Sequence, residues 1–253
     1  MTSSVIQPGE RVRVRDRLIV ALDVPDLVTA VGHVERLGES VLWYKVGLQL
    51  YSAAGREAVA ALAGLGKRIF LDLKLHDIPA TVERAIRAFE GLPVSLLTVH
   101  ASGGPEMLTA AVHAARSVPG RPRVLGVTML TSLDGTEIPA LWNPQTGLEE
   151  KILELSRLCE RCGIDGVVAS PREIRALRGQ HRAPFLIVTP GVRGPNEAAH
   201  DQKRTLSLPE ALAQGADFVV VGRPILSAAD PKAVIASYEA AVTQPPSTER
   251  TGR

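Results

Sequence analysis

The sequence predicts an α/β fold, a single-domain (β/α)8 or TIM barrel, and three observations support this prediction. The chain has 253 residues, and (β/α)8 barrels commonly contain about 250. Short apolar runs alternate with segments of helical periodicity, as expected when each buried parallel strand is followed by a covering helix. Polar residues follow several apolar runs, at the end where a barrel carries its active site. Periodicity alone leaves a doubly wound open sheet as the alternative.

The predicted elements follow one another in a regular order. Short, continuous apolar runs predict strands over 18–22, 42–46, 69–73, 94–99, 124–128, 166–169, 185–188 and 218–221. Apolar residues repeated every three or four positions predict helices over 26–37, 55–65, 80–89, 104–116 and 148–159. Composition predicts a flexible polar arm over 1–14, the barrel domain over 15–241 and a disordered tail over 242–253.

The composition argues against several classes of function. The 29 basic and 27 acidic residues give a net charge of only +2, whereas nucleic-acid binding usually requires a strongly basic face. No stretch reaches the roughly 18 uninterrupted apolar residues of a membrane-spanning helix, and no secretory signal pattern is present. We therefore expect a cytoplasmic protein that binds neither nucleic acid nor membrane.

The sequence also lacks the usual signatures of metal and cofactor sites. Cys159 and Cys162 form a C-x-x-C spacing, but they lie in a predicted helix. A redox pair would sit where a strand turns into a helix, and a zinc site would need two more ligands nearby. The histidines are scattered, and neither G-x-G-x-x-G nor a phosphate-binding P-loop occurs. We therefore expect ordinary helix cysteines in a reducing compartment, and no motif supports a zinc site or the use of nicotinamide, flavin or ATP.

Two opposite charges, Asp72 and Lys74, interrupt the apolar run that forms the third predicted strand, and Asp77 follows it. Strand side chains alternate between faces, so Asp72 and Lys74 should point the same way. Buried charges are costly unless they are paired, and nearby carboxylates should keep Lys74 protonated. A fixed ammonium can stabilise a developing carbanion and then donate a proton. The alternative is a structural ion network at the rim of the barrel.

The last predicted strand runs into Gly222, Arg223 and a proline suited to the first turn of a helix. Backbone N–H groups at such a turn can bind a phosphate, glycine allows close approach, and arginine adds a charged hydrogen bond. Barrels often bind phosphate after strands seven and eight. The alternative is an ordinary turn with a solvated arginine.

The segment after the seventh predicted strand is long and polar. It runs from Gly191 to Thr205 and has Arg193 near its start. Loops of this length are usually functional lids or disordered segments, so a phosphate clamp with a closing loop and a surface loop without a ligand both remain possible. His100, at the end of the fourth strand, is equally open between a catalytic base and a structural histidine.

Taken in order, these motifs resemble the orotidine 5′-phosphate decarboxylase family over about residues 16–240. The hallmark is D-x-K-x-x-D-I-x-x-T-V over 72–82. The supporting motifs are Leu22-Asp23, Lys45-Val46-Gly47-Leu48, His100-Ala101-Ser102-Gly103-Gly104, Leu130-Thr131-Ser132, Pro190-Gly191-Val192-Arg193 with Asp201-Gln202, and Val221-Gly222-Arg223. The resemblance implies a cofactor-free conversion of orotidine 5′-phosphate to UMP and CO₂, in a homodimer with shared active sites.

The resemblance also implies roles for individual residues. Lys74 would protonate C6 of the pyrimidine, Asp72 would lie beside the leaving CO₂ group, and Lys45 would link Asp72 to the ribose. The other implied substrate contacts are Asp23 at the ribose, Asp77, Ile78 and Thr81 from the partner subunit, Thr131 and Ser132 at the base, Pro190, Arg193, Gly222 and Arg223 around the phosphate, and Gln202 between phosphate and base.

Two other functions compete with this assignment. Phosphosugar barrels of the 3-keto-gulonate-phosphate decarboxylase or hexulose-phosphate synthase type share D-x-K-x-x-D but use magnesium. Their metal-binding glutamate is expected near the end of the second strand, where Lys45 stands here. A catalytically inactive barrel that binds phosphate ligands is the other possibility, although such a protein has no use for the charges of Asp72, Lys74 and Asp77.

Overall fold

The computed structural model describes residues 13–131, 147–191 and 206–243 and confirms the predicted barrel. Its parallel strands are β1 (Leu18–Ala21), β2 (Trp43–Gly47), β3 (Arg68–Leu75), β4 (Val94–His100), β5 (Arg123–Val127), β6 (Gly166–Val168), β7 (Leu186–Pro190) and β8 (Phe218–Val221). They follow one another around a closed barrel in chain order. The pairing of Leu18 in β1 with Val219 in β8 closes the ring, so the open-sheet alternative is wrong.

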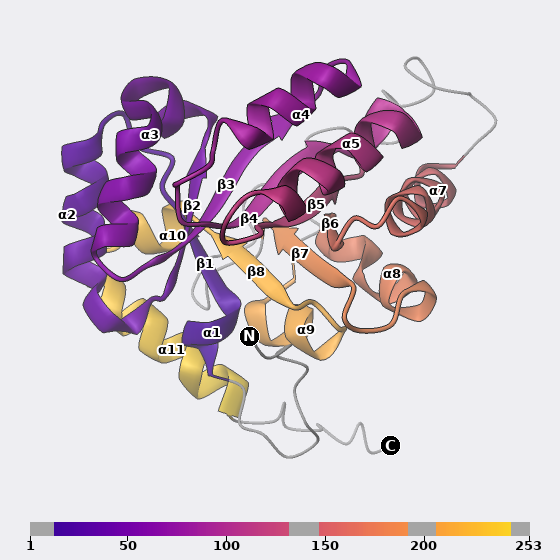
Figure 1. The fold of residues 1–253 in the computed structure, drawn as a ribbon. Coiled ribbons are helices and arrows are strands. Elements are labelled where there is room, and N and C mark those ends of the chain that lie inside the picture. The colour runs from indigo at the N-terminus through magenta and orange to yellow at the C-terminus, as the bar shows by residue number, and fades with distance from the viewer. Residues whose placement is uncertain (1–12, 132–146, 192–205, 244–253) are drawn as a thin grey trace, which may run out of the picture.

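Helices surround this barrel (Figure 1). The longer ones are α2 (Leu27–Leu37), α3 (Leu48–Gly64), α4 (Pro79–Arg87), α5 (Gly104–Ser117), α7 (Leu148–Arg161), α8 (Ile174–Gln180) and α11 (Pro231–Thr243). Shorter ones are α1 (Val14–Arg17), α9 (Leu208–Ala213) and α10 (Arg223–Leu226), with 3₁₀ turns at η1 (Gly38–Ser40), η2 (Ala101–Gly103) and η3 (Pro171–Glu173). None of these described helices is long and apolar enough to cross a membrane.

The start of the second predicted helix differs from the prediction. α3 begins at Leu48, because Gly55 is a kink with φ 54° between two helical segments rather than the start of the helix. Helices also include the last position assigned to the arm and the first two assigned to the tail. Val14 begins α1 and is fully buried, while α11 continues to Thr243. The remainder of the predicted arm and tail, residues 1–12 and 244–253, lies outside the described residues.

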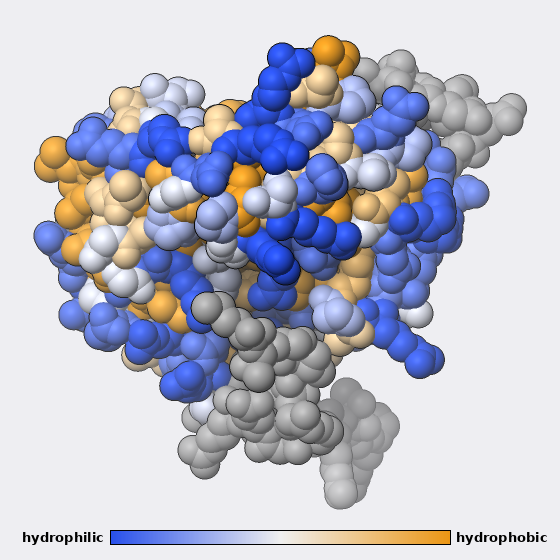
Figure 2. All heavy atoms as spheres, viewed as in Figure 1, coloured by the Kyte–Doolittle hydropathy of each residue, from blue (hydrophilic) through white to orange (hydrophobic). Residues whose placement is uncertain are grey.

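Apolar side chains form two clusters, one between the strands and the helices and one inside the barrel. The interior cluster includes Ile19, Trp43, Phe70, Leu96 and Phe218, which come from alternate positions along their strands. The rings of Trp43 and Phe218 lie 4.9 Å apart although β1 separates their strands, so these positions point across the barrel. Hydrophilic and hydrophobic residues are interspersed on the outer face shown in Figure 2.

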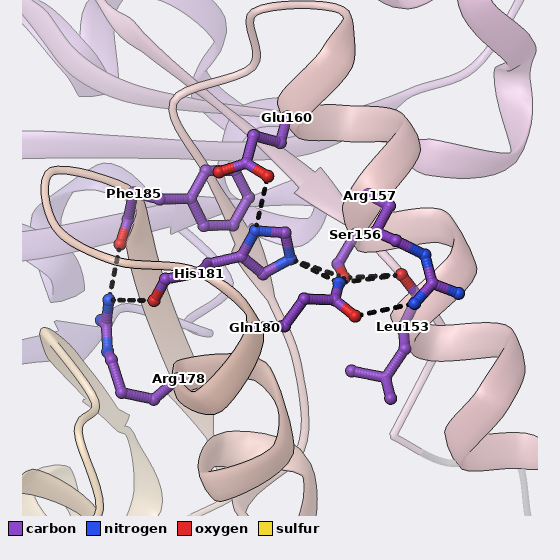
Figure 3. A network of polar contacts seen from close by, with 8 residues as sticks. All are labelled: Leu153, Ser156, Arg157, Glu160, Arg178, Gln180, His181 and Phe185. Carbon is purple, nitrogen blue, oxygen red and sulfur yellow. Dashed lines mark hydrogen bonds and ion pairs between the residues drawn. The ribbon is translucent and has the colours of Figure 1, made fainter.

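A polar network ties α7 to α8 at the end of the barrel where the strands begin (Figure 3). Arg157 donates to Gln180 Oε1 at 2.8 Å, which turns the Gln180 amide nitrogen toward Ser156 Oγ and His181 Nε2. His181 Nε2 also lies 2.9 Å from Ser156 Oγ, and its Nδ1 lies 3.0 Å from a Glu160 oxygen. The network lies just before β7, away from the strand ends that carry a barrel's chemistry.

Candidate active site

The interior of the barrel becomes polar at the carboxyl ends of the first four strands. The inward-facing register of β2 continues from Trp43 to Lys45, and that of β3 continues from Phe70 to Asp72. In β4 the same register leads from Leu96 to Thr98 and His100, while Asp23 follows β1. The change from apolar to charged side chains along each strand therefore creates one polar cluster at one mouth of the barrel.

Asp72 is the centre of this cluster and is only 8% exposed. Lys74 Nζ lies 2.9 Å from each of its two carboxylate oxygens. Lys45 Nζ lies 3.6 Å from Oδ2, and the Thr98 hydroxyl donates to Oδ1 at 3.0 Å. A buried carboxylate surrounded by donors in this way is held in one orientation, because any rotation would break several charged hydrogen bonds.

Lys45 forms the second link of the cluster. Its ammonium lies 3.0 Å from Asp23 Oδ1 and so bridges Asp23 to Asp72. The Lys45 side chain is 12% exposed, whereas that of Asp23 is 58% exposed. Gly47 leaves the space that Lys45 occupies, since a Cβ on Gly47 would lie 2.8 Å from Lys45 Nζ. This series of charged contacts thus leads from the buried Asp72 to the open mouth of the barrel.

The contact between Asp72 and Lys74 is confirmed, but regular strand alternation is not its cause. Lys74 has φ 51°, a left-handed conformation that is rare for residues other than glycine. The pairing of β3 with β4 is irregular at the same place, between Leu71 and Leu75. The Lys74 amide donates to Thr98 Oγ1 at 2.9 Å instead of to a strand carbonyl. A bulge therefore turns Lys74 back onto Asp72.

Two histidines lie beside the charged cluster, with the rings of His76 and His100 5.2 Å apart. Burial lowers the pKa of His100, and electrostatic interactions with His76 and Lys74 lower it further, against a smaller opposing effect of Asp72. His100 is therefore biased toward its neutral form. This bias suits either of the roles considered for it, proton acceptance or structural hydrogen bonding.

Asp77, Ile78 and Thr81 are exposed at the same mouth of the barrel. The Asp77 carboxylate accepts from the Ile78 amide at 2.6 Å. Within the described part of the chain, Asp77 forms no ion pair with Lys74. Asp72 alone supplies the paired carboxylate within the subunit.

The residues expected at the phosphate and the base are only partly described. Pro190 ends β7 and is paired with Val220 of β8, so it lies close to Gly222, which follows β8. Arg223 begins α10 and is exposed, as is Thr131 after β5. Ser132, Arg193 and Gln202 lie outside the described residues, and so does most of the expected closing loop.

Thr98 is the residue at this site that sequence reasoning missed. It is fully buried and joins Asp72 to the backbone of Lys74. A threonine within an apolar strand carries little signal, because threonine is common in strands. Its position two residues before His100, on the same face of β4, was the available signal.

Cys159 on α7 and Cys162, which directly follows that helix, are both free thiols. Burial raises the pKa of the Cys159 thiol to about 12, which makes this cysteine unreactive. Among the described residues, no group of three or more His, Cys, Asp or Glu side chains is arranged to hold a metal ion.

A closed (β/α)8 barrel with lysines and carboxylates at the carboxyl ends of its strands has the architecture of a barrel enzyme. Comparison with known protein families identifies the family to which this barrel belongs. Residues 16–238 match the model of the orotidine 5′-phosphate decarboxylase / HUMPS family. The chain belongs to this family, as the ordered motifs indicated.

Individual relatives agree with this assignment. The chain is 43% identical over 246 residues to orotidine 5′-phosphate decarboxylase of Moorella thermoacetica, covering 95% of this chain and 98% of the relative. It is 46% identical over 219 residues to the enzyme of that name from Rhodopseudomonas palustris, covering 87% and 90%. The crystal structure of orotidine 5′-phosphate decarboxylase from Lactobacillus acidophilus superposes with a TM-score of 0.80 at 34% identity, covering 90% of this chain and 100% of that one.

Proposed function

We propose that this protein decarboxylates orotidine 5′-phosphate to UMP and CO₂, and is thus a carboxy-lyase of pyrimidine biosynthesis. Its membership of the family and its relatives at 41–46% identity support this reaction. The observation that carries the proposal is the Lys74 ammonium, held 2.9 Å from both oxygens of a buried carboxylate. Such a pair is already oriented before substrate arrives, which is what electrostatic stabilisation of a transition state requires.

The proposed chemistry assigns one step to each charged group. The bond between C6 and the substrate carboxylate breaks, CO₂ leaves, and the electron pair stays on C6. The Lys74 ammonium stabilises this carbanion and transfers a proton to C6, which gives UMP and a neutral lysine that solvent reprotonates. Asp72 lies beside the departing carboxylate and orients Lys74. This sequence of steps requires neither a metal ion nor an organic cofactor.

The remaining contacts would hold the nucleotide across the mouth of the barrel. Lys45 and Asp23 lead from Asp72 toward solvent, and they would bind the ribose hydroxyls. Gly222 and Arg223 would bind the phosphate together with Pro190 and Arg193, while Gln202 would lie between phosphate and base. Thr131 and Ser132 would contact the pyrimidine. Binding energy from the distant phosphate can then hold C6 against Lys74.

A homodimer with shared active sites forms part of the proposal. Among the described residues, four of the five exposed large hydrophobic side chains follow the carboxyl ends of strands, and exposed apolar patches commonly mark protein interfaces. Those that follow the carboxyl ends of strands are Val28 (84% exposed), Leu48 (58%), Ile78 (65%) and Leu130 (39%). In a dimer formed through this face, Asp77, Ile78 and Thr81 would reach the partner's site. The free thiols of Cys159 and Cys162 fit a cytoplasmic location.

The direct test is the absorbance change of orotidine 5′-phosphate with the purified protein in EDTA. We expect turnover in EDTA, and we expect Lys74→Ala to reduce kcat by at least about 10³-fold. UMP binding by Lys74→Ala should change much less, because the ammonium acts mainly on the transition state. Lys232→Ala, which removes an exposed lysine of α11, is the matched control and should behave as wild type.

Each other outcome would support a competing function. Activity abolished by EDTA and restored by magnesium would favour a metal-dependent phosphosugar enzyme. Tight UMP binding without any turnover would favour a phosphate-binding barrel that has lost catalysis. Equal losses of UMP binding and turnover in Lys74→Ala would mean that Lys74 is not specific to the transition state.

A further inference from the structure

The irregular pairing of β3 with β4 leaves three residues of one strand opposite a single residue of the other. Leu71 pairs with Leu97, and the next pair is Leu75 with Val99. Asp72, Leu73 and Lys74 therefore lie opposite Thr98 alone. A bulge of this kind leaves backbone groups without partners from the ladder, and it redirects the side chains that it carries. Bulges next to active sites commonly serve this purpose.

The Thr98 hydroxyl binds one backbone group that the bulge releases and one side chain that the bulge carries. It accepts a hydrogen bond from the Lys74 amide at 2.9 Å and donates one to Asp72 Oδ1 at 3.0 Å. A hydroxyl has a single proton, and the amide can only donate, so the direction of both bonds is determined. Thr98 is fully buried, so water cannot replace either bond.

Both bonds act on the groups that the proposed reaction uses. One holds the amide of Lys74 in its left-handed conformation with φ 51°, which persists only where the surrounding structure enforces it. The other orients the carboxylate that binds the Lys74 ammonium. The hydroxyl thus connects the backbone of Lys74 to the carboxylate that its own side chain binds.

We propose that Thr98 is a positioning residue for the decarboxylation: its hydroxyl fixes the bulge and the Asp72 carboxylate, and thereby places Lys74 Nζ for proton transfer. This inference rests on the proposed function. A solely structural threonine would contribute to stability without a specific effect on turnover. A substitution that removes the hydroxyl but conserves the side-chain volume separates the two roles, because only the positioning role predicts a specific loss of turnover.

The test compares three variants by kinetics and by the unfolding midpoint. Thr98→Val keeps the shape and removes the hydroxyl, whereas Thr98→Ser keeps the hydroxyl. Thr128→Val is the matched control, because Thr128 is also buried and, among the described residues, its hydroxyl bonds the Val168 carbonyl at 3.3 Å and no group of the charged cluster. We expect Thr98→Val to lower kcat by about 10- to 100-fold, as for a catalytic group displaced by about 1 Å. The KM of Thr98→Val, and the kcat of Thr98→Ser and Thr128→Val, should stay within about threefold of wild type.

A second measurement follows the Lys74 amide directly by hydrogen exchange in the ¹⁵N-labelled protein. Protection of this amide should be retained in Thr98→Ser and lost in Thr98→Val, while neighbouring strand amides stay protected. Wild-type kcat in Thr98→Val, or equal protection of Lys74 in both variants, would overturn the positioning role. If the wild-type protein does not decarboxylate orotidine 5′-phosphate, the proposed function is wrong, and the exchange measurement alone decides whether Thr98 holds the bulge.

Discussion

Replacing Gly47 with alanine should impair the proposed reaction while leaving the fold intact. Gly47 ends β2 and precedes α3, with φ −96° and ψ −175°, a backbone conformation that alanine adopts easily. Its missing Cβ would lie 2.8 Å from Lys45 Nζ and 3.2 Å from Asp23 Oδ1. The atoms in the way are therefore the ends of two side chains that we assign to the ribose.

The geometry sets the size of the expected effect. Favourable contacts between heavy atoms begin near 3.5 Å, so Lys45 Nζ, now 2.8 Å from the Cβ position, would retreat by about 0.7 Å. This movement would disturb its ion pairs with Asp23 and Asp72, whose oxygens now lie 3.0 Å and 3.6 Å from Nζ. A misplacement of about 1 Å can cost about 100-fold in rate. We therefore expect kcat/KM to fall by about 10- to 100-fold.

Stability should change little. Replacing glycine lowers the conformational entropy of the unfolded chain, which favours folding, and the flexible Lys45 side chain can move away from the added methyl group. We expect the free energy of unfolding to stay within about 1 kcal/mol of wild type. Gly32→Ala is the matched control, since Gly32 lies on α2 and its Cβ would contact nothing within 4 Å. It should stabilise the protein by about 0.5–1 kcal/mol and leave kcat/KM unchanged.

Decarboxylation kinetics and urea unfolding of both variants test this argument. Wild-type kcat/KM in Gly47→Ala would show that the position of Lys45 does not matter and would refute the reasoning. Loss of several kcal/mol of stability together with activity would show that the added methyl group disrupts the fold instead.

Two further predictions concern the dimer and the pH dependence of stability. Mixing inactive Lys74→Ala with inactive Asp77→Ala should restore about a quarter of wild-type activity, because half the dimers would be hybrids with one complete site; hybrids that form but stay inactive would contradict a shared site. Burial raises the pKa of the Glu173 carboxyl from 4.5 to about 7, so its contribution to stability is fully present below pH 4.5 and is lost as the pH rises through about 7. Glu173→Gln should therefore gain about 2–3 kcal/mol of unfolding free energy relative to wild type between pH 5 and pH 8, measured by urea denaturation. The exposed Glu150→Gln on α7 is the control, and a pH-independent difference for Glu173→Gln would refute the assignment.

The fold could be predicted because its signal is repeated along the chain. Strands buried on both faces produce continuous apolar runs, and each observed strand lies within about two residues of its predicted range. α3 shows where the same reasoning fails. Gly55 looks like the start of a helix, but its left-handed φ of 54° joins two helical segments that both pack on the barrel. A kink inside a packed helix is set by its surroundings rather than by local preference.

The charged part of the site could also be predicted, because charges in apolar strands are conspicuous. Asp23, Lys45, Asp72 and Lys74 lie together at the mouth of the barrel, connected by distances of 2.9–3.6 Å. The position of Asp77 could not be derived from spacing in the same way. It lies only three residues beyond Lys74, yet its carboxylate turns back to the Ile78 amide at the start of α4.

Lys74 shows why a correct contact can be predicted on an incomplete argument. Alternation along β3 places Asp72 and Lys74 on one face, but an unbroken strand would also send the Lys74 amide into the ladder with β4. In the structure that amide bonds the side chain of Thr98, which is 24 residues away in sequence. The backbone of Lys74 adopts φ 51°, at a cost of roughly 1–3 kcal/mol. No local pattern contains this information, because the bulge depends on a partner strand and on one hydroxyl. If the proposed function is correct, the strained Lys74 and the Thr98 opposite it act together in the reaction, and the D-x-K motif contains only the lysine.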